Sequence, residues 1–503
     1  MKSTIRSASN HRVVRTLKRT SPLALLTVVL LVLAVPSGMV ISSAFTAPDQ
    51  SLRAAASVPA WQQLPSEMSR PQGISPLLDS APIPSPDKVA AHLESTLKTD
   101  GGGAFTALVK DAVTGQVLFD RGGSDSRIPA SNMKLLTAVA ALRSMGSETR
   151  FSTRVLAGQA PASVVLAGGG DVLLGAGESA PDQVVGRAGL ATLARLTVQS
   201  LKENGVTGAV SVQLDDSLFT GPALNPAWSL EDVAAGETAP LYPLALNSAR
   251  YDPLKTTGPR PQDSAITTAE AFAAELKTAG AASGLTVAPG VGRSGSEAAA
   301  SGGPATGSGG DAGPEVLAEV QSATVSQQVD LMLQTSDNYL AEALGRMSAH
   351  ADGLPAGNDG ATATVMKQLT GLGVNVDTMR LADVSGLALG NRVSARQFAE
   401  VVRAITSGPD PRLRNALAGF PVAGLTGTLD DRYGDDSTAG GAGLVRAKTG
   451  TLNSVIALSG YVVDAEGRLL VFSFIGNGLM PGAAGNKAAL DRSASALASC
   501  GCR

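Results

Sequence analysis

In this chain, Pro129-Ala130-Ser131-Asn132-Met133-Lys134 opens the run Met133 to Leu142, which contains no Gly or Pro. This run predicts a buried helix. Ser131 and Lys134 stand three positions apart at its start, so both side chains share one face. A lysine takes a proton from a serine hydroxyl only when its amine is neutral, and burial favours the neutral form. The stretch therefore indicates a serine nucleophile with a lysine as its base.

A second motif, Ser336-Asp337-Asn338, lies between two segments with a helical pattern, Val325 to Leu333 and Tyr339 to Met347. The Ser336 hydroxyl and the Asn338 carboxamide suit a loop that relays a proton to a leaving amine and binds a substrate amide. Because Ser, Asp and Asn are also preferred helix caps, a plain cap remains an open alternative.

A third motif, Lys448-Thr449-Gly450-Thr451, follows the predicted strand Val445 to Lys448. Its lysine and hydroxyl groups suit a substrate carboxylate, and Gly450 leaves room for substrate backbone. Lys448 is also a second cation that would lower the pKa of Lys134 by repulsion.

Other sequence signals narrow the chemistry. The chain has only three histidines, His11, His92 and His350, which offers few candidates for a Ser-His-Asp triad. Lysine is therefore the better candidate for the base. A second Ser-x-x-Lys segment, Ser95 to Lys98, is followed by Asp100 and three glycines. No buried helix can start there, which favours Ser131 as the nucleophile.

The composition indicates an exported globular protein. The chain has 503 residues, 44% hydrophobic and 17% charged, with a net charge of −3, which gives no reason to expect a nucleic-acid partner. Six basic residues precede the apolar run Leu23 to Val35, so residues 1–47 are expected to form a signal peptide or an N-terminal membrane anchor. In both cases the body of the protein is exported. It is secreted if the segment is cleaved, and it is anchored to the membrane through this segment alone if the segment is uncleaved.

We expect five parts along the chain. Residues 48–97 form a Pro-rich linker with a short helix near its end, and residues 98–150 begin a catalytic domain. Residues 151–317 form an inserted module with short strand-like runs, and residues 318–503 complete the catalytic domain. Within the module, Arg293 to Gly313 is nearly all Gly, Ser and Ala and predicts a mobile loop.

The remaining pattern predicts an α+β fold. Strand-like segments occur at 105–110, 116–119, 455–463 and 469–475, and a helix is expected at 486–498. Only Cys500 and Cys502 are present, which excludes a disulfide framework. We expect a frayed tail with two thiols, although a local bridge stays open. No metal site and no cofactor are expected, because neither cysteine has a His or carboxylate cluster nearby.

Together the three motifs resemble those of serine β-lactamases and penicillin-binding proteins. The chain resembles in particular the low-molecular-mass class C enzymes, D-alanyl-D-alanine carboxypeptidases/endopeptidases of the penicillin-binding protein 4 type. The long separation of Ser131 from Ser336 (336 − 131 = 205) fits the large insertion of that family. The supporting segments are Gly168 to Asp171, Asp215 to Phe219, Asp383 to Leu387 and Leu425 to Leu429, with Val384 standing where the family pattern has glycine.

The resemblance implies a β-lactamase/transpeptidase-like antiparallel sheet covered by helices, interrupted by the inserted module. It also implies that peptidoglycan stem peptides are the substrates and that β-lactam antibiotics acylate the enzyme. When the roles of the family's motif residues are carried over to this chain, Ser131 is the nucleophile and Lys134 is its base. The backbone N–H groups of Ser131 and Thr451 then form the oxyanion hole. Ser336 and Asn338 serve the second motif, and Lys448, Thr449 and Thr451 bind the substrate carboxylate.

Two alternatives remain beside this serine-type D-Ala-D-Ala carboxypeptidase. One is a serine β-lactamase, which the wide spacing of the motifs and the lack of a Glu-x-x-Leu-Asn segment disfavour. The other is a non-catalytic cell-envelope protein that uses the same fold for binding. The residues leave open the balance of carboxypeptidase and endopeptidase action, the role of the module, cleavage of the leader and the oligomeric state.

Overall fold

The computed structural model describes residues 77, 80–160, 162–294 and 314–502. The leader expected at 1–47, most of the linker, and residues 295–313 of the Gly/Ser-rich loop lie outside the described residues. In the part that is described, no helix is both long and apolar enough to cross a membrane.

A five-stranded antiparallel sheet with the order β10-β11-β12-β1-β2 forms the centre of the catalytic region. The sequence predicted all of these strands, although β12 runs five residues further than expected. Their bounds are β1 Gly102–Asp111, β2 Val117–Arg121, β10 Arg446–Leu452, β11 Val455–Val463 and β12 Leu469–Met480.

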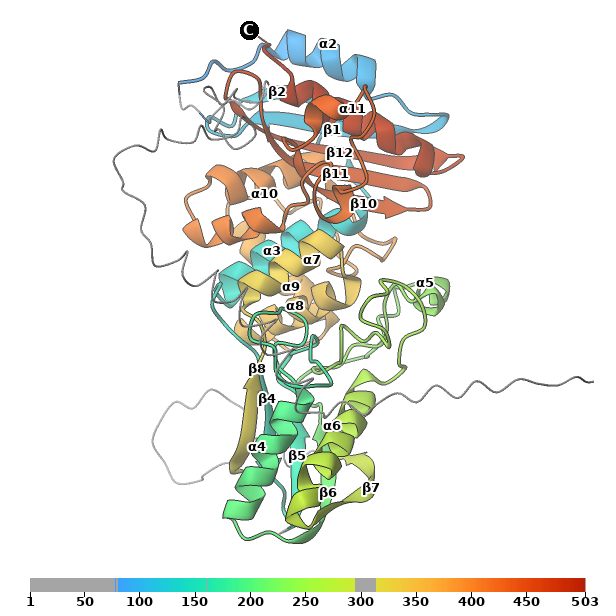
Figure 1. Cartoon of the computed structure of the whole chain (residues 1–503). Helices are drawn as coiled ribbons and strands as arrows, with labels where there is room; N and C mark the ends of the chain where they lie inside the picture. Colours follow the sequence, from blue (N-terminus) through green and yellow to red (C-terminus); the bar gives the residue numbers. More distant parts are fainter. Residues whose placement is uncertain (1–76, 78–79, 161, 295–313, 503) are drawn as a thin grey trace, which may run out of the picture. The chain divides into compact units, whose positions relative to one another are not determined.

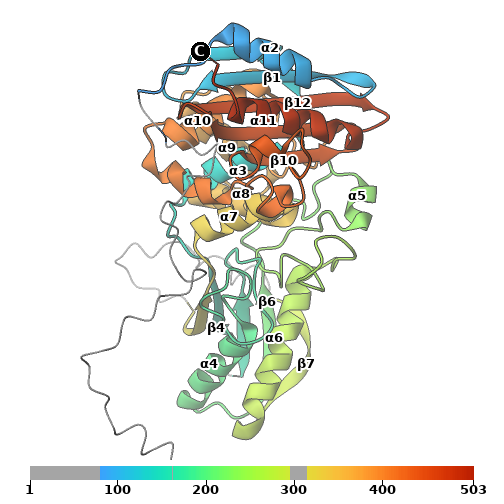
Figure 2. The ribbon, with the colours of Figure 1, turned by 45° about the horizontal axis from the view of Figure 1, so that its top comes forward.

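Both faces of this sheet are covered by helices (Figures 1 and 2). Along β12, Phe472 and Phe474 belong to the hydrophobic cluster under α2 (Pro86–Thr96) and α11 (Lys487–Ala498), whereas Val471 and Ile475 belong to the cluster on the other side. This alternation is the period-2 pattern of a strand buried on both faces.

The second helical layer is built around α3 (Met133–Ser144). Its residues from Met133 to Leu142 are all buried, as the run without Gly or Pro predicted. The elements that surround α3 and complete this layer are α7 Val325–Thr335, α8 Asn338–Ala351, α9 Asn358–Thr370, α10 Ala395–Ser407, the 3-10 helix η5 Pro411–Gly419 and the small sheet of β3 Ser126–Arg127 with β9 Val393–Ser394.

The region between the first two motifs forms its own sheet, with the order β7-β6-β5-β4-β8. Strands β5, β6 and β7 are parallel and are connected by α4 and α6, as parallel strands require crossover connections. The bounds are β4 Ser152–Ala157, β5 Ser163–Ala167, α4 Leu190–Glu203, β6 Gly208–Asp215, α5 Leu230–Ala235, α6 Ser264–Gly280, β7 Leu285–Arg293 and β8 Val316–Gln321.

The sequence interpretation missed α4 and α6. In α4 the signal was present, because its buried residues recur at helical spacing: Leu190, Leu193, Ala194, Thr197, Val198 and Leu201. The sequence predicts that Arg293 belongs to the mobile loop, but in the structure it ends β7 and pairs with the carboxylates of Asp216 and Asp263.

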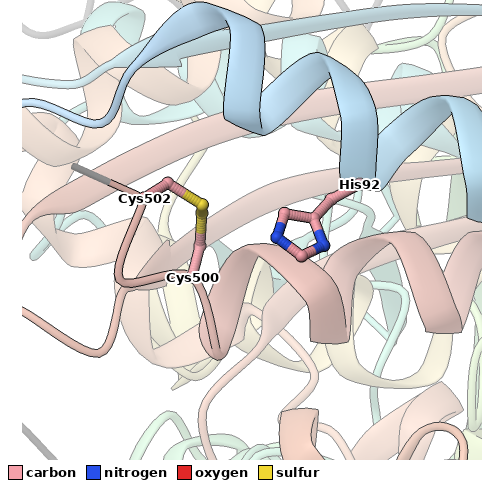
Figure 3. Close-up of side chains that lie close together, drawn as sticks. All are labelled: His92, Cys500 and Cys502. Carbon is pink, nitrogen blue, oxygen red and sulfur yellow. A yellow bond between two sulfur atoms is a disulfide. The ribbon is translucent and has the colours of Figure 1, made fainter.

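Both ends of the described body pack more tightly than expected. Within the predicted linker, α2 buries Val89 and Leu93 against the sheet and α11, so the linker ends before this helix. The tail is not frayed: Cys500 and Cys502 are 3% and 4% exposed and are joined as a disulfide. The fold also places His92 of α2 beside them, although no histidine is near them in the sequence (Figure 3).

Candidate active site

The turn that carries Ser131 is enclosed by two close-packed glycines. The 3-10 helix η2 (Ala130–Asn132) leads into α3, and Ala130 has a left-handed backbone with φ 48°. A Cβ atom at Gly386 would overlap the Ala130 carbonyl, and one at Gly450 would lie 3.1 Å from the Ser131 nitrogen. The sequence explains Gly450 by room for substrate; in the structure, strand β10 also packs directly on the Ser131 turn at this position.

Lys134 is fully buried and is surrounded by oxygen atoms. Its Nζ lies 3.1 Å from Ser131 Oγ, 2.6 Å from Asn338 Oδ1 and 2.8 Å from the carbonyl oxygen of Ser385. Burial lowers the pKa of Lys134 to about 8, against the opposing effect of nearby carboxylates. Ser131 therefore has a neighbouring amine whose pKa lies close to physiological pH, as a general base requires.

Asn338 connects the second motif to Lys134. Ser336 follows α7 with a left-handed backbone, φ 58°, and the Asp337 side chain caps α8 by accepting a backbone N–H at 3.0 Å. The Asn338 Nδ2 atom donates to the Glu237 carbonyl at 3.0 Å, so its Oδ1 atom faces Lys134. Asp337 is therefore a helix cap, and Ser336 and Asn338 on either side of it line the cavity.

The inserted module supplies two of the contacts that hold this motif. One is the Glu237 carbonyl, and the other is Arg250, whose Nη1 lies 2.8 Å from Asp337 Oδ2. Burial alone would raise the pKa of Asp337, but Arg250 and the capping N–H hold it below its ordinary value. Sequence reasoning missed Glu237 and Arg250, because both lie roughly 90 to 100 positions before the motif and no local pattern marks them.

A buried carboxylate organises the loop that faces Lys134. Asp383 accepts hydrogen bonds from Trp228 Nε1 at 2.9 Å and Asn391 Nδ2 at 2.7 Å, and from the backbone N–H groups of Gly386 and Ala388. These bonds fix the loop so that the Ser385 carbonyl points at Lys134. The sequence drew attention to this segment only through its family resemblance and gave it no role.

The departure from the family pattern at Val384 has a local partner. Val384 is fully buried, and a Cβ atom at Gly345 of α8 would lie 2.6 Å from Val384 Cγ2. Its backbone N–H donates to Glu342 Oε1 at 3.0 Å. The larger side chain at 384 thus fits because residue 345 is a glycine.

The third motif lies on β10, next to the Ser131 turn. Lys448 is fully buried, and its Nζ donates to the Thr449 carbonyl at 2.9 Å. Burial and repulsion from Lys134 lower the pKa of Lys448 well below its ordinary value. The sequence predicts that this repulsion lowers the pKa of Lys134; in the structure, burial is the main cause of the lowered pKa of both lysines.

The predicted site residues gather around one open cavity of about 760 Å³. Two of them, Lys134 and Lys448, are fully buried and do not line it. Those that line the cavity are Ser131, Ser336, Asn338, Thr449, Gly450 and Thr451.

The pKa of Lys134 predicts how acylation depends on pH. With the neutral amine as the base, as the sequence predicts, the acylation rate should rise with pH and level off above about 8. The check is the second-order rate of acylation by benzylpenicillin from about pH 6 to 9. A rate that is flat or falls over this range would exclude Lys134 as the base.

A charge-removing variant makes the pH test specific to Lys134. The Glu342 carboxylate is one of the groups that raise the pKa of Lys134, and burial raises its own pKa to about 7. Replacing it by a neutral amide, Glu342→Gln, should move the acylation midpoint to lower pH, because the ammonium loses a stabilising charge. A midpoint that moves upward, or not at all, would mean that another group controls the profile.

The comparisons with known proteins agree on one family. The model of the D-Ala-D-Ala carboxypeptidase 3 (S13) family matches residues 89–283 and 262–497. A carboxypeptidase of Mycobacterium tuberculosis is 35% identical over 436 residues, covering 86% of this chain and 88% of that protein. Carboxypeptidase DacB of Mycolicibacterium smegmatis is 34% identical over 433 residues, with the same two shares. The crystal structure of penicillin binding protein 4 from Haemophilus influenzae has a TM-score of 0.59 at 21% identity, covering 80% of this chain and 97% of that one.

The architecture is thus the transpeptidase-like α+β fold with an inserted module, as in penicillin-binding protein 4. The chain belongs to the D-Ala-D-Ala carboxypeptidase 3 (S13) family. It is a serine-type D-Ala-D-Ala carboxypeptidase of the penicillin-binding protein 4 type, which confirms the predicted fold class, family and enzyme class. Family membership favours this activity over the β-lactamase and over the non-catalytic envelope protein.

Proposed function

We propose that Ser131 carries out the carboxypeptidase reaction through an acyl-enzyme on peptidoglycan stem peptides. Ser131 Oγ attacks the carbonyl carbon of the penultimate D-Ala, and Lys134 takes the hydroxyl proton. The peptide C–N bond breaks, the terminal D-Ala leaves with a proton, and an ester to Ser131 remains. Water then hydrolyses the ester. β-Lactam antibiotics acylate the same serine and inhibit the enzyme.

The observation that carries this proposal is the contact between Lys134 and Ser131. Their Nζ and Oγ atoms are 3.1 Å apart, which is within the reach of direct proton transfer, and the lysine pKa of about 8 suits the task. Asn338, which contacts Lys134, is proposed to bind the substrate amide, and Ser336, which lines the cavity, is proposed to pass a proton to the leaving amine.

The edge of β10 is the proposed binding site for the terminal carboxylate. Thr449 and Gly450 line the cavity, and Lys448, which precedes them on the strand, is fully buried. A bound carboxylate would favour the charged form of Lys448 and so compensate its burial. The backbone N–H groups of Ser131 and Thr451 are the proposed oxyanion hole, because the Ser131 nitrogen lies against the neighbouring Gly450.

Turnover of defined peptides tests this function. The full-length protein should release D-Ala from an acylated peptide that ends in D-Ala-D-Ala. It should act far more slowly on the same peptide with a C-terminal carboxamide, which lacks the carboxylate. Cleavage of a cross-linked muropeptide dimer would add DD-endopeptidase action. Failure to release D-Ala, or equal rates for acid and amide, would contradict the proposed reaction or its carboxylate site.

Replacing Lys448 tests the carboxylate site by itself. We expect Lys448→Ala to slow acylation by D-Ala-D-Ala peptides by roughly 10²-fold, as for the loss of one preorganised electrostatic donor. The pH midpoint should move little, because burial is the main cause of the lowered pKa of Lys134 and does not depend on Lys448. Lys448→Arg should also be impaired, because a planar guanidinium does not fit a buried ammonium site. An unchanged rate in Lys448→Ala would remove Lys448 from the site.

The proposed place of action is the cell envelope outside the cytoplasm. The basic and apolar leader expected at 1–47 supports export, and the peptidoglycan substrate lies in that compartment. The body is then secreted, or held at the membrane by the N-terminal segment alone. The N-terminal sequence of the mature protein distinguishes these two cases.

A further inference from the structure

Three metal-ligating side chains meet where α2 packs against the C-terminal tail. His92 comes from α2, and Cys500 and Cys502 follow α11 (Figure 3). One potential ligand atom from each lies within 4.8 Å of the other two. Four hundred and eight positions separate His92 from Cys500 (500 − 92), so only the fold brings them together.

The packing of α2 on the tail holds this arrangement in place. The Ser85 N–H, just before α2, donates to the Cys502 carbonyl, and the hydroxyls of Thr96 and Ser493 are 2.9 Å apart across α2 and α11. Both cysteines are buried in the hydrophobic cluster that also contains Leu93, whereas His92 is exposed. The sulfur atoms therefore lie beneath the surface and the imidazole at its edge, which leaves one side open to an ion from solvent.

The disulfide itself adds little to the stability of the fold. Its Cα atoms are 5.0 Å apart, a usual separation for a disulfide. However, the bridge links residues only two positions apart, so it closes a very small loop and ties no helix or strand to another. The chain-entropy stabilisation by a disulfide grows with the length of the loop that it closes, so this one is not explained as a structural staple.

We propose that the dithiol form of this cluster is a Zn²⁺ site, with Cys500 Sγ, Cys502 Sγ and a ring nitrogen of His92 as ligands and water as the fourth. Two equivalents of a small thiol reduce the disulfide to two Cys thiols and are themselves oxidised to a disulfide. Binding of Zn²⁺ then releases two protons, and the two thiolates neutralise the ion. Two cysteines and one histidine with one open position is a ligand set that zinc accepts.

The observed geometry needs only a small rearrangement to reach such a site. Ligand atoms around tetrahedral zinc are about 3.5–4 Å apart, and the three groups already lie within 4.8 Å. Opening the sulfur–sulfur bond moves the two sulfur atoms apart, toward that spacing. The hydrophobic cluster of α2 and α11 lies across the sheet from α3, so the proposal does not depend on the catalytic assignment.

Cobalt binding to the full-length protein tests the site. The protein is reduced under nitrogen, freed of reductant and titrated with Co²⁺, which gives a sulfur-to-cobalt charge-transfer band when thiolates bind it. We expect one Co²⁺ per chain, with the band displaced by Zn²⁺. The oxidised protein and the variant Cys500→Ser/Cys502→Ser should show no band. His92→Ala should bind roughly tenfold more weakly or worse, since even second-shell losses cost that much.

A matched histidine variant separates a ligand from a general effect on folding. His350→Ala changes an exposed histidine at the end of α8 and should bind Co²⁺ as tightly as the wild type. The proposal is overturned if the reduced wild type gives no more charge-transfer absorbance than the serine variant. It is equally overturned if His92→Ala retains full affinity. Penicillin labelling should be unchanged in all of these variants, so a loss of labelling points to the catalytic site instead.

Discussion

Ser131→Ala is expected to abolish labelling by a fluorescent penicillin and to lower the turnover of D-Ala-D-Ala peptides by roughly 10⁶-fold, as for other serine nucleophiles. The serine is placed by close packing on two sides, at Gly386 and Gly450, and its Oγ lies 3.1 Å from Lys134 Nζ. Alanine fits the turn without strain, so the loss should be purely chemical.

The control for this variant is the serine of the other Ser-x-x-Lys segment. Ser95 is exposed near the end of α2, and its Oγ donates to the His92 carbonyl at 2.7 Å. Lys98, the lysine that would act as the base in this segment, is also exposed. Ser95→Ala should therefore label and turn over like the wild type. Labelling that persists in Ser131→Ala would mean that another residue is the nucleophile.

Lys134→Met should lower the acylation rate by roughly 10³-fold or more, since general-base catalysis contributes about 10² to 10⁴. Methionine fills a similar volume in a fully buried position but cannot accept the Ser131 proton. The residual rate should also lose its rise toward pH 8, because the group that titrates there is gone. This second readout matters, because a merely structural role of Lys134 would not remove the pH dependence.

Lys98→Met is the matched control, because it removes the exposed lysine of the Ser95 segment. It should leave the rate and the pH profile unchanged. Far-ultraviolet circular dichroism of Lys134→Met should match the wild type, although the Asn338 amide and the Ser385 carbonyl lose their buried donor. A folded Lys134→Met protein with wild-type acylation would contradict the assignment of the base.

Sequence reasoning succeeded where the signal is local. Met133 to Leu142 reads as a buried helix because no Gly or Pro interrupts it, and β11 was predicted with the bounds that the structure gives it, Val455–Val463. The three motifs could be recognised because each is a short run of chemically distinctive residues. The family resemblance predicted that the three motifs meet around one cavity. Their spacing in the chain did not predict it.

The missed features depend on contacts between distant segments. Glu237 and Arg250 orient the second motif from the inserted module, and Asp383 acts through backbone N–H groups that no pattern reveals. The extent to which the pKa of Lys134 and the pKa of Lys448 are lowered depends on how deeply each side chain is buried. The sequence predicts this burial only in outline. The meeting of His92 with the tail cysteines requires the packing of α2 on α11, whereas the sequence predicts only a short helix within a linker there.

The most direct test of the central claim is mass spectrometry of the wild-type full-length protein after reaction with benzylpenicillin. The intact mass should increase by one penicilloyl group per chain. Peptide mapping should place that group on Ser131, with Ser95 and Ser336 unmodified. An adduct on any other residue, or no stable adduct at a concentration that saturates related enzymes, would contradict the proposed catalytic site.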